Sequence, residues 1–187
     1  MKRLLISIVA IFLFIIMTAC TNQSTKETNF KSKETQKVGF TKQDVQKAVS
    51  DGHIVIEQTT DDDTAFGNNE PNAIEVYNLK KIFAFEDNVD EKGGNSELKI
   101  TTFRPKFPTI TNTLSFDGKY VHFKDTWSNG NEYKCESIST VKTGGDVKLF
   151  NCIDKKGEKK GEVYVFSDNK THFLNVKEEY KSELEKK

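Results

Sequence analysis

The side chains that could do chemistry in this sequence are histidines, serines, acidic residues and cysteines, and their spacing decides what they could form. His53, His122 and His172 are isolated from one another, and no His-Glu-x-x-His pair for zinc is present. Serine and aspartate are frequent, but the sequence has no Gly-x-Ser-x-Gly elbow, which exposes the nucleophilic serine of many hydrolases. The sequence therefore predicts no catalytic residues, although a trio assembled only by folding stays open.

Clustered aspartates and paired glycines could indicate a metal or phosphate site, but neither has the required spacing here. The aspartates at 61–63 are consecutive, whereas calcium loops alternate their ligands so that the side chains converge on one ion. We interpret them as part of a solvated acidic loop over 57–75. The glycine pairs at 93–94 and 144–145 lack the strand-loop-helix context of a phosphate loop, so we expect turns there and no metal or cofactor.

Cys20 ends an N-terminal segment with the three parts of an export signal. Two basic residues follow Met1, the stretch from Leu4 to Met17 is apolar apart from one serine, and small residues lead into the cysteine. This stretch of fourteen residues is too short for a membrane-spanning helix, which needs roughly 20. We therefore expect cleavage rather than an uncleaved signal anchor.

The sequence MTAC at 17–20 resembles the lipobox of bacterial lipoproteins, with methionine in place of the usual leucine. The resemblance implies that residues 1–19 are a signal peptide and that the thiol of Cys20 carries a diacylglyceryl (palmitate-type) anchor. Two acyl chains hold a protein stably at a membrane, whereas one gives only marginal binding. We expect the protein at the outer, extracytoplasmic face of the cell membrane. Residues 20–37 are almost wholly polar and predict a disordered tether.

Cys135 and Cys152 are the other two cysteines, and each lies in a segment that is predicted to be a strand. A hairpin that turns at Thr143-Gly144 places them directly opposite each other. In an exported domain such a pair favours a disulfide. Two free buried thiols are the alternative, and a zinc site is disfavoured because no second cysteine pair or histidine pair accompanies them.

The composition indicates a well-solvated body and argues against nucleic acid as a partner. Mean hydropathy is −0.61 and 30 % of the residues are charged. Of the 28 basic residues, Lys2 and Arg3 leave with the signal, so 26 remain against 28 acidic ones. That balance lacks the clustered basic surface that binds phosphates. The remaining length fits one domain, which we place at 38–175, with a charged helix or tail at 176–187.

The pattern along the chain predicts two helices and then consecutive short strands. Thr41 is suited to cap the first helix, because Asp44 follows three residues later and Val45 begins an apolar stripe. Asn78 is a good cap for the second helix. Consecutive strands favour an α+β fold with an antiparallel sheet of about five to six strands. We expect the two N-terminal-half helices to pack on one face of this sheet and a charged C-terminal helix to follow.

A tight hairpin is predicted at Asp117-Gly118, a pair that suits a two-residue turn. This turn pairs Phe116 with Lys119. Alternate residues of the two strands then face the core: Leu114, Phe116, Val121 and Phe123.

A family pattern also emerges from the order of these segments. The matching features are NLKK at 78–81, a helix ending at 88–89, LKI at 98–100, LSFDGK at 114–119, and the cysteines at 135 and 152. Over roughly 38–167 the chain resembles an uncharacterised domain family of small lipoproteins from low-GC Gram-positive, Bacillus-like bacteria. Members usually carry an acidic Glu-Gly-Asp-Pro turn before the hairpin, where this chain has RPKFP at 104–108. The resemblance implies a fold and a membrane address, and no activity.

Three aromatic residues with polar atoms are the best candidates for a binding surface. Tyr120 is expected to project from the outer sheet face, and Trp127 and Tyr133 flank a polar turn. The alternative is that they cover the edge of the core. The preferred hypothesis is a non-catalytic surface module that binds a protein, peptide or envelope component. The alternatives are a small envelope enzyme, such as a hydrolase, and a solute-binding receptor, which needs a deep cleft.

Overall fold

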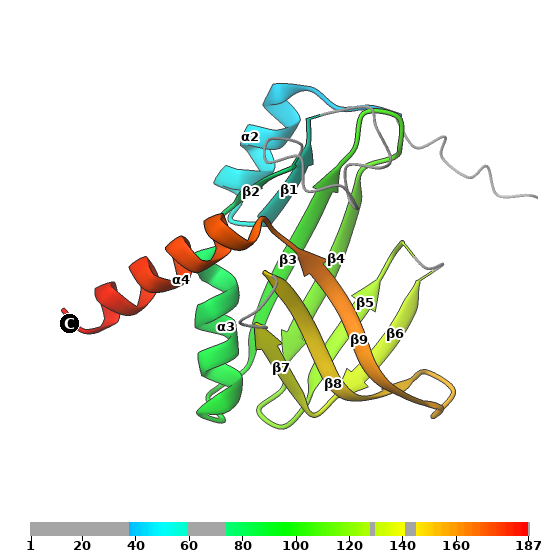
Figure 1. The fold of residues 1–187 in the computed structure, drawn as a ribbon. Coiled ribbons are helices and arrows are strands. Elements are labelled where there is room, and N and C mark those ends of the chain that lie inside the picture. Colours follow the sequence, from blue (N-terminus) through cyan, green and yellow to red (C-terminus); the bar gives the residue numbers. More distant parts are fainter. Residues whose placement is uncertain (1–37, 60–73, 128–129, 141–144, 187) are drawn as a thin grey trace, which may run out of the picture. The chain divides into compact units, whose positions relative to one another are not determined.

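A computed structural model describes residues 38–59, 74–127, 130–140 and 145–186. These residues form a curled mixed sheet of nine strands and three helices (Figure 1). The helices are α2 (Lys42–Ser50), α3 (Lys80–Asp90) and α4 (Lys170–Leu184). The strands are β1 (Ile54–Gln58), β2 (Ile74–Tyr77), β3 (Ser96–Phe103), β4 (Ile110–Phe116), β5 (Val121–Asp125), β6 (Asn131–Cys135), β7 (Ser137–Thr140), β8 (Asp146–Asp154) and β9 (Lys159–Ser167). The protein is mostly β, so the predicted α+β fold with about five to six strands is wrong.

The sheet is mixed, so the predicted antiparallel sheet is also wrong. The strands are ordered β2-β1-β3-β4-β5-β6-β8-β7, and β9 pairs with β8. β1 and β3 are parallel, whereas the other neighbouring strands are antiparallel. A parallel pair needs a crossover connection, and here β2 and α3 lie between β1 and β3 in the chain. The prediction missed β2 because its IEVY segment adjoins the acidic run assigned to a loop.

α2 and α3 lie on opposite faces of the sheet, so the expectation that both helices cover one face is wrong. Val55 packs with Val45 and Phe103 in a cluster under α2. Ile54 and Ile56 belong instead to the main core, which includes the apolar face of α3. All three β1 residues are at most 4 % exposed, as expected for a strand that is covered on both faces.

The two predicted helix caps have different outcomes. Thr41 and Asp44 form the expected capping box at the start of α2, with each side chain accepting from the other residue's backbone N–H. Asn78 does not cap α3. Its backbone φ is +58°, and its Nδ2 donates to the carbonyl oxygens of Val49, at 2.9 Å, and His53, at 2.7 Å. The amide therefore ties the start of α3 to the segment that joins α2 to β1.

The β4–β5 hairpin has the predicted faces but a different register. Phe116 pairs with Val121 rather than with Lys119, so the loop has four residues instead of two. Asp117 Oδ1 accepts a hydrogen bond from the N–H of Tyr120 at 2.7 Å, and this local side-chain bond stabilises the longer loop. Because the register moved by two residues, the same side chains still face the core.

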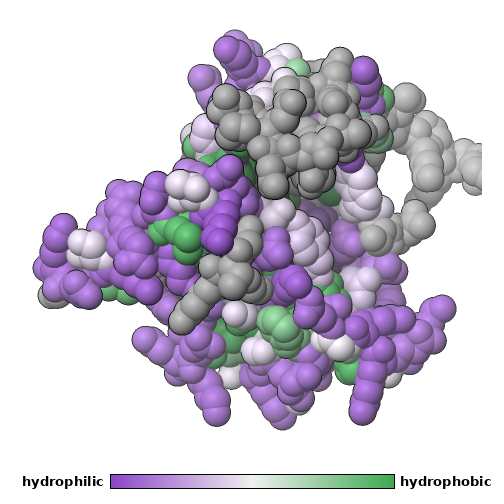
Figure 2. All heavy atoms as spheres, in the orientation of Figure 1, coloured by the Kyte–Doolittle hydropathy of each residue, from purple (hydrophilic) through white to green (hydrophobic). Residues whose placement is uncertain are grey.

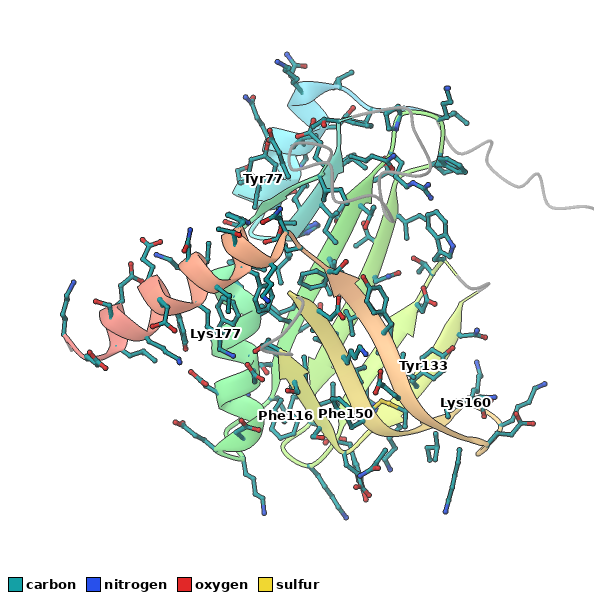
Figure 3. The ribbon with its side chains drawn as sticks, in the orientation of Figure 1. Tyr77, Phe116, Tyr133, Phe150, Lys160 and Lys177 are labelled. Carbon is teal, nitrogen blue, oxygen red and sulfur yellow. A yellow bond between two sulfur atoms is a disulfide. The ribbon has the colours of Figure 1, made fainter. Side chains whose placement is uncertain are left out.

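Cys135 and Cys152 are joined by a disulfide, with their Cα atoms 4.0 Å apart, and Figure 3 draws it as a yellow bond. β6 and β7 pair with β8 in one continuous register, in which the two cysteines are directly opposite. The predicted pairing of the strands is therefore confirmed, although the expected single strand is divided into β6 and β7. The turn predicted at Thr143-Gly144 lies outside the described residues.

The C-terminal helix α4 begins at Lys170, before the charged helix or tail predicted at 176–187. It is also packed against the core. Asn169 Oδ1 caps it by accepting from the N–H of Thr171 at 2.9 Å. Phe173 is fully buried, and its ring centroid lies 5.1 Å from that of Phe83 on α3 in an edge-to-face arrangement.

The predicted signal peptide, the predicted lipidation site Cys20 and the predicted tether all lie outside the described residues, as do the aspartates at 61–63. Among the helices that the structure describes, none is long and apolar enough to cross a membrane. Figure 2 shows a largely hydrophilic face, and α4 in particular is hydrophilic along most of its visible surface.

Candidate binding pocket

The curled sheet encloses a half-open pocket of about 410 Å³, within the range of small-ligand pockets, about 300–1,000 Å³. One wall comes from β1, β3, β4 and β5, and the other comes from β9, which passes in front of part of this wall in Figure 1. The lining residues are Ile56, Thr102, Ile110, Asn112, Phe123 and Asp125 on the first wall, Tyr164, Val165, Phe166 and Ser167 on β9, and Arg104 and Trp127 in the segments after β3 and β5.

The pocket lies where polar residues enter the core-facing rows of the sheet. On β4 the buried Leu114 is followed on the same face by Asn112, and on β5 the buried Phe123 is followed by Asp125. Thr102 has the corresponding place at the end of the row on β3. Polar side chains at core-facing positions cost stability unless they are hydrogen-bonded or exposed to a ligand site. These three residues therefore replace core packing by a polar-lined hollow.

Trp127 stands at the rim of the pocket in a fixed aromatic group. Its side chain is half exposed, and its ring centroid lies 6.2 Å from that of Phe107. The guanidinium of Arg104 lies over both rings, 4.0 Å from the centroid of Phe107 and 4.9 Å from that of Trp127. Arg104 Nε also donates to Gln58 Oε1 at 2.9 Å. Such cation–π contacts are worth about 0.5–1 kcal/mol at exposed sites, so they orient the indole before a ligand arrives.

Two polar lining residues hold the turn that carries Trp127. Asp125 Oδ1 accepts from the backbone N–H of Trp127 at 3.0 Å. Asn112 Oδ1 accepts from the N–H of Thr126 at 2.9 Å and from its hydroxyl at 2.8 Å. In both cases the side-chain oxygen is the acceptor, so the Nδ2 group is the part of the Asn112 amide that can donate.

The three predicted binding residues are placed differently. Trp127 lines the pocket. Tyr133 lies beside it, since its ring stacks on that of the lining residue Phe123 with centroids 6.3 Å apart. Tyr120 lies beyond the other end of β5, where the Nζ of Lys134 sits 3.8 Å above its ring. The structure therefore brings Tyr133 and Trp127 to the same region and separates Tyr120 from them.

An aspartate–histidine pair lies at the start of α4. His172 Nδ1 and Asp168 Oδ2 are 2.5 Å apart, and the Asp168 side chain is almost wholly buried. Burial raises the pKa of the Asp168 carboxyl above its ordinary value, and the hydrogen bond to His172 opposes that shift. Neither residue lines the pocket, and the pair links the residue before the N-cap Asn169 to the first turn of α4.

A second polar cluster links three elements. Lys177 on α4 donates to Thr140 Oγ1 at 2.5 Å and lies 3.5 Å from Glu86 Oε2 on α3. Figure 3 shows Lys177 where α4 meets α3. A lysine beside a hydroxyl could activate a nucleophile, but Thr140 is only 2 % exposed and its N–H and hydroxyl both donate to Glu86. The cluster stabilises the packing of both helices on β7.

The chemistry of the pocket favours recognition over catalysis. The lining side chains that carry a guanidinium, carboxyl or phenol group are Arg104, Asp125 and Tyr164. Across the described segments of the chain, no group of three or more histidine, cysteine, aspartate or glutamate side chains is placed to hold a metal ion. The lining offers hydrogen bonds, an aromatic surface and apolar contacts, which are the means of binding.

Sequence reasoning missed Arg104, Asn112, Asp125 and Tyr164, although part of the signal was present. Extending the core-facing alternation of the predicted hairpin from Leu114 to the next inward position reaches a polar residue, Asn112. A polar residue at an inward position indicates either a buried hydrogen bond or a site. The β9 wall had no such signal, because it depends on how the sheet curls.

No family model, curated protein or solved structure matches this chain. The resemblance to the lipoprotein domain family therefore stays a prediction, and the function has to be argued from the pocket.

Proposed function

We propose that this protein is a membrane-anchored lipoprotein whose curled sheet binds a ligand in the pocket, without catalysis, at the outer face of the cell membrane. The lipobox-like MTAC and the diacylglyceryl group expected on Cys20 support the address. The pocket supports the binding role. The disulfide between Cys135 and Cys152 suits an exported domain.

The proposal depends on the three polar residues that lie where β3, β4 and β5 reach the pocket. Thr102, Asn112 and Asp125 occupy core-facing positions, where apolar residues would fill the space and increase stability. The fold instead keeps a hollow there, with a half-exposed tryptophan at its rim. Asn112 and Asp125 also accept hydrogen bonds from the turn that carries Trp127, so the polar positions order the rim of the hollow.

Photo-cross-linking on intact cells tests the proposal. Benzoylphenylalanine is introduced into the full-length chain in place of Tyr164, and in a control in place of Tyr120, which lies away from the pocket. We expect a discrete cross-linked product from position 164 and none from position 120. The same products from both positions would show that the contacts are not made through the pocket.

The address is tested separately with a fatty-acid probe. Cys20→Ala should abolish labelling and release the protein from the membrane, because the anchor cysteine is absent. Ser24→Ala, which changes a polar residue close to Cys20 and keeps all three cysteines, is the matched control and should label as the wild type does. Unchanged labelling of Cys20→Ala would exclude the lipobox assignment.

A further inference from the structure

The β9 wall of the pocket is formed by four consecutive residues, Tyr164 to Ser167. Successive side chains of a strand point to opposite faces, so one face of β9 cannot account for all four. A bulge explains part of this, because Val147 pairs with Phe166 and Lys148 pairs with Tyr164, which leaves Val165 as an extra residue. Tyr164 and Ser167 lie on either side of that bulge, so the edge of the strand itself borders the pocket.

That edge carries no neighbouring strand in the described sheet. β9 pairs with β8 along one side, and no other described strand pairs with it. The unpaired side of an edge strand presents a row of backbone N–H and C=O groups to solvent. Such a row is a template on which another extended chain can add as a further strand.

The two halves of β9 differ in how strongly their residues disfavour the addition of another strand. The first half contains Lys159, Lys160 and Gly161, and lysine and glycine are residues that discourage edge-to-edge pairing. Lys160 is also held in ion pairs with Asp154 and Glu158. The second half reads Val-Tyr-Val-Phe over 163–166, a sequence with high strand propensity. The bulge at Val165 interrupts this half at one residue, and the half without lysine and glycine is the one that borders the pocket.

From this arrangement we infer that the ligand is an extended peptide segment of another protein, which pairs with the edge of β9 and places one apolar side chain in the pocket. The inference rests on the proposed role of the pocket as the binding site. Backbone hydrogen bonds to β9 supply affinity that is independent of sequence, and the pocket supplies specificity for a side chain. Phe123 and Phe166 offer apolar contact to that side chain, and the indole of Trp127 covers it from the rim.

The probe is a set of linear peptides selected from a displayed random library on the mature chain with Cys20→Ser, which lacks only the anchor. Binding is followed by the fluorescence of Trp127, the one tryptophan in the chain. Each amide of the best peptide is then N-methylated in turn, so the protein is unchanged throughout. We expect losses of about tenfold at every second residue, because alternate N–H groups face β9 and each lost hydrogen bond costs about 1–1.5 kcal/mol.

Two protein variants and hydrogen exchange separate the outcomes. Tyr164→Ala should weaken binding and Tyr120→Ala should not, and bound peptide should slow amide exchange within 163–167. Pocket binding without the alternating pattern or the protection would overturn the peptide inference and leave the pocket role intact. Peptides that bind with equal affinity to both variants and without a response of Trp127 would contradict both. A dimer in solution with the β9 edge protected before any peptide is added would overturn the inference, because a second copy would then occupy the edge.

Discussion

Asp125 accepts a hydrogen bond from the backbone N–H of Trp127, with 3.0 Å between Oδ1 and the nitrogen. One lining residue therefore fixes the turn that carries another, and the indole is held over the pocket in the absence of a ligand. A binding site that is ordered beforehand loses less conformational entropy when the ligand arrives.

Removing this acceptor should loosen Trp127. We expect Asp125→Ala to increase the rapid motion of the indole, measured by time-resolved fluorescence anisotropy, and to cost about 1 kcal/mol of ligand affinity. Asp125→Asn keeps an oxygen acceptor at the same place and is the control. Equal anisotropy decays in the two variants would mean that the hydrogen bond does not order the rim.

The disulfide should contribute substantially to stability. Cys135 and Cys152 close a loop with a sequence separation of 17, which corresponds to about 3 kcal/mol in the chain-entropy description. Reduction should lower the free energy of unfolding by about 2–4 kcal/mol in urea titrations. Intact mass of the protein isolated from cells without reductant should be two hydrogens below the reduced value. Two thiols that alkylate freely in that material would refute the bridge.

The C-terminal helix should be part of the folded core rather than a frayed tail. Phe173→Ala should lower the free energy of unfolding by about 3–5 kcal/mol, because Phe173 is fully buried against Phe83. Leu184, at the end of the same helix, is 46 % exposed, so Leu184→Ala should change it by no more than about 0.5 kcal/mol. Similar small effects of both substitutions would show that α4 is not docked.

Stability should fall when the solution is acidified through the ordinary histidine range. Burial, assisted by the charge of Lys99, lowers the pKa of His53, whose Nδ1 lies 2.8 Å from Thr101 Oγ1. The unfolded chain then takes up a proton near pH 6.5, before the folded chain does, so the free energy of unfolding decreases as pH falls below about 6.5. His53→Asn should show a smaller decrease across the same range in denaturant titrations. An identical pH dependence would assign the loss to other groups.

Local features of the fold could be predicted from the sequence, and the curl of the sheet could not. The capping box at Thr41, the core faces of the β4–β5 hairpin and the opposed cysteines all depend on residues close in sequence or on simple alternation. The hairpin register was wrong by two because Asp117 can bond to two backbone N–H groups of a longer loop. The two-residue turn and the four-residue loop have similar energies, and both give the same alternation of apolar and polar residues, so the pattern does not distinguish them.

The candidate site was predicted only where it depended on residue type. Trp127 was predicted because an aromatic residue with a polar atom suits a binding surface, whereas Arg104 reached the site through stacking on two rings that come from different loops. Tyr164 belongs to the opposite wall, which exists because β9 pairs with β8 and the sheet then curls back over β4 and β5. Such long-range placement is set by the summed twist of the strands, which no single segment encodes.

The most direct test of the central claim, that the pocket under Trp127 is the binding site, is a fluorescence titration of the mature chain carrying Cys20→Ser with the partner recovered by cross-linking. We expect a saturable shift of the Trp127 emission to shorter wavelength and reduced quenching by acrylamide, since the half-exposed indole would become covered. Tyr120→Ala should leave the curve unchanged, and Tyr164→Ala should move it to higher partner concentration. Binding that is detected by calorimetry while the Trp127 emission stays constant would contradict the claim.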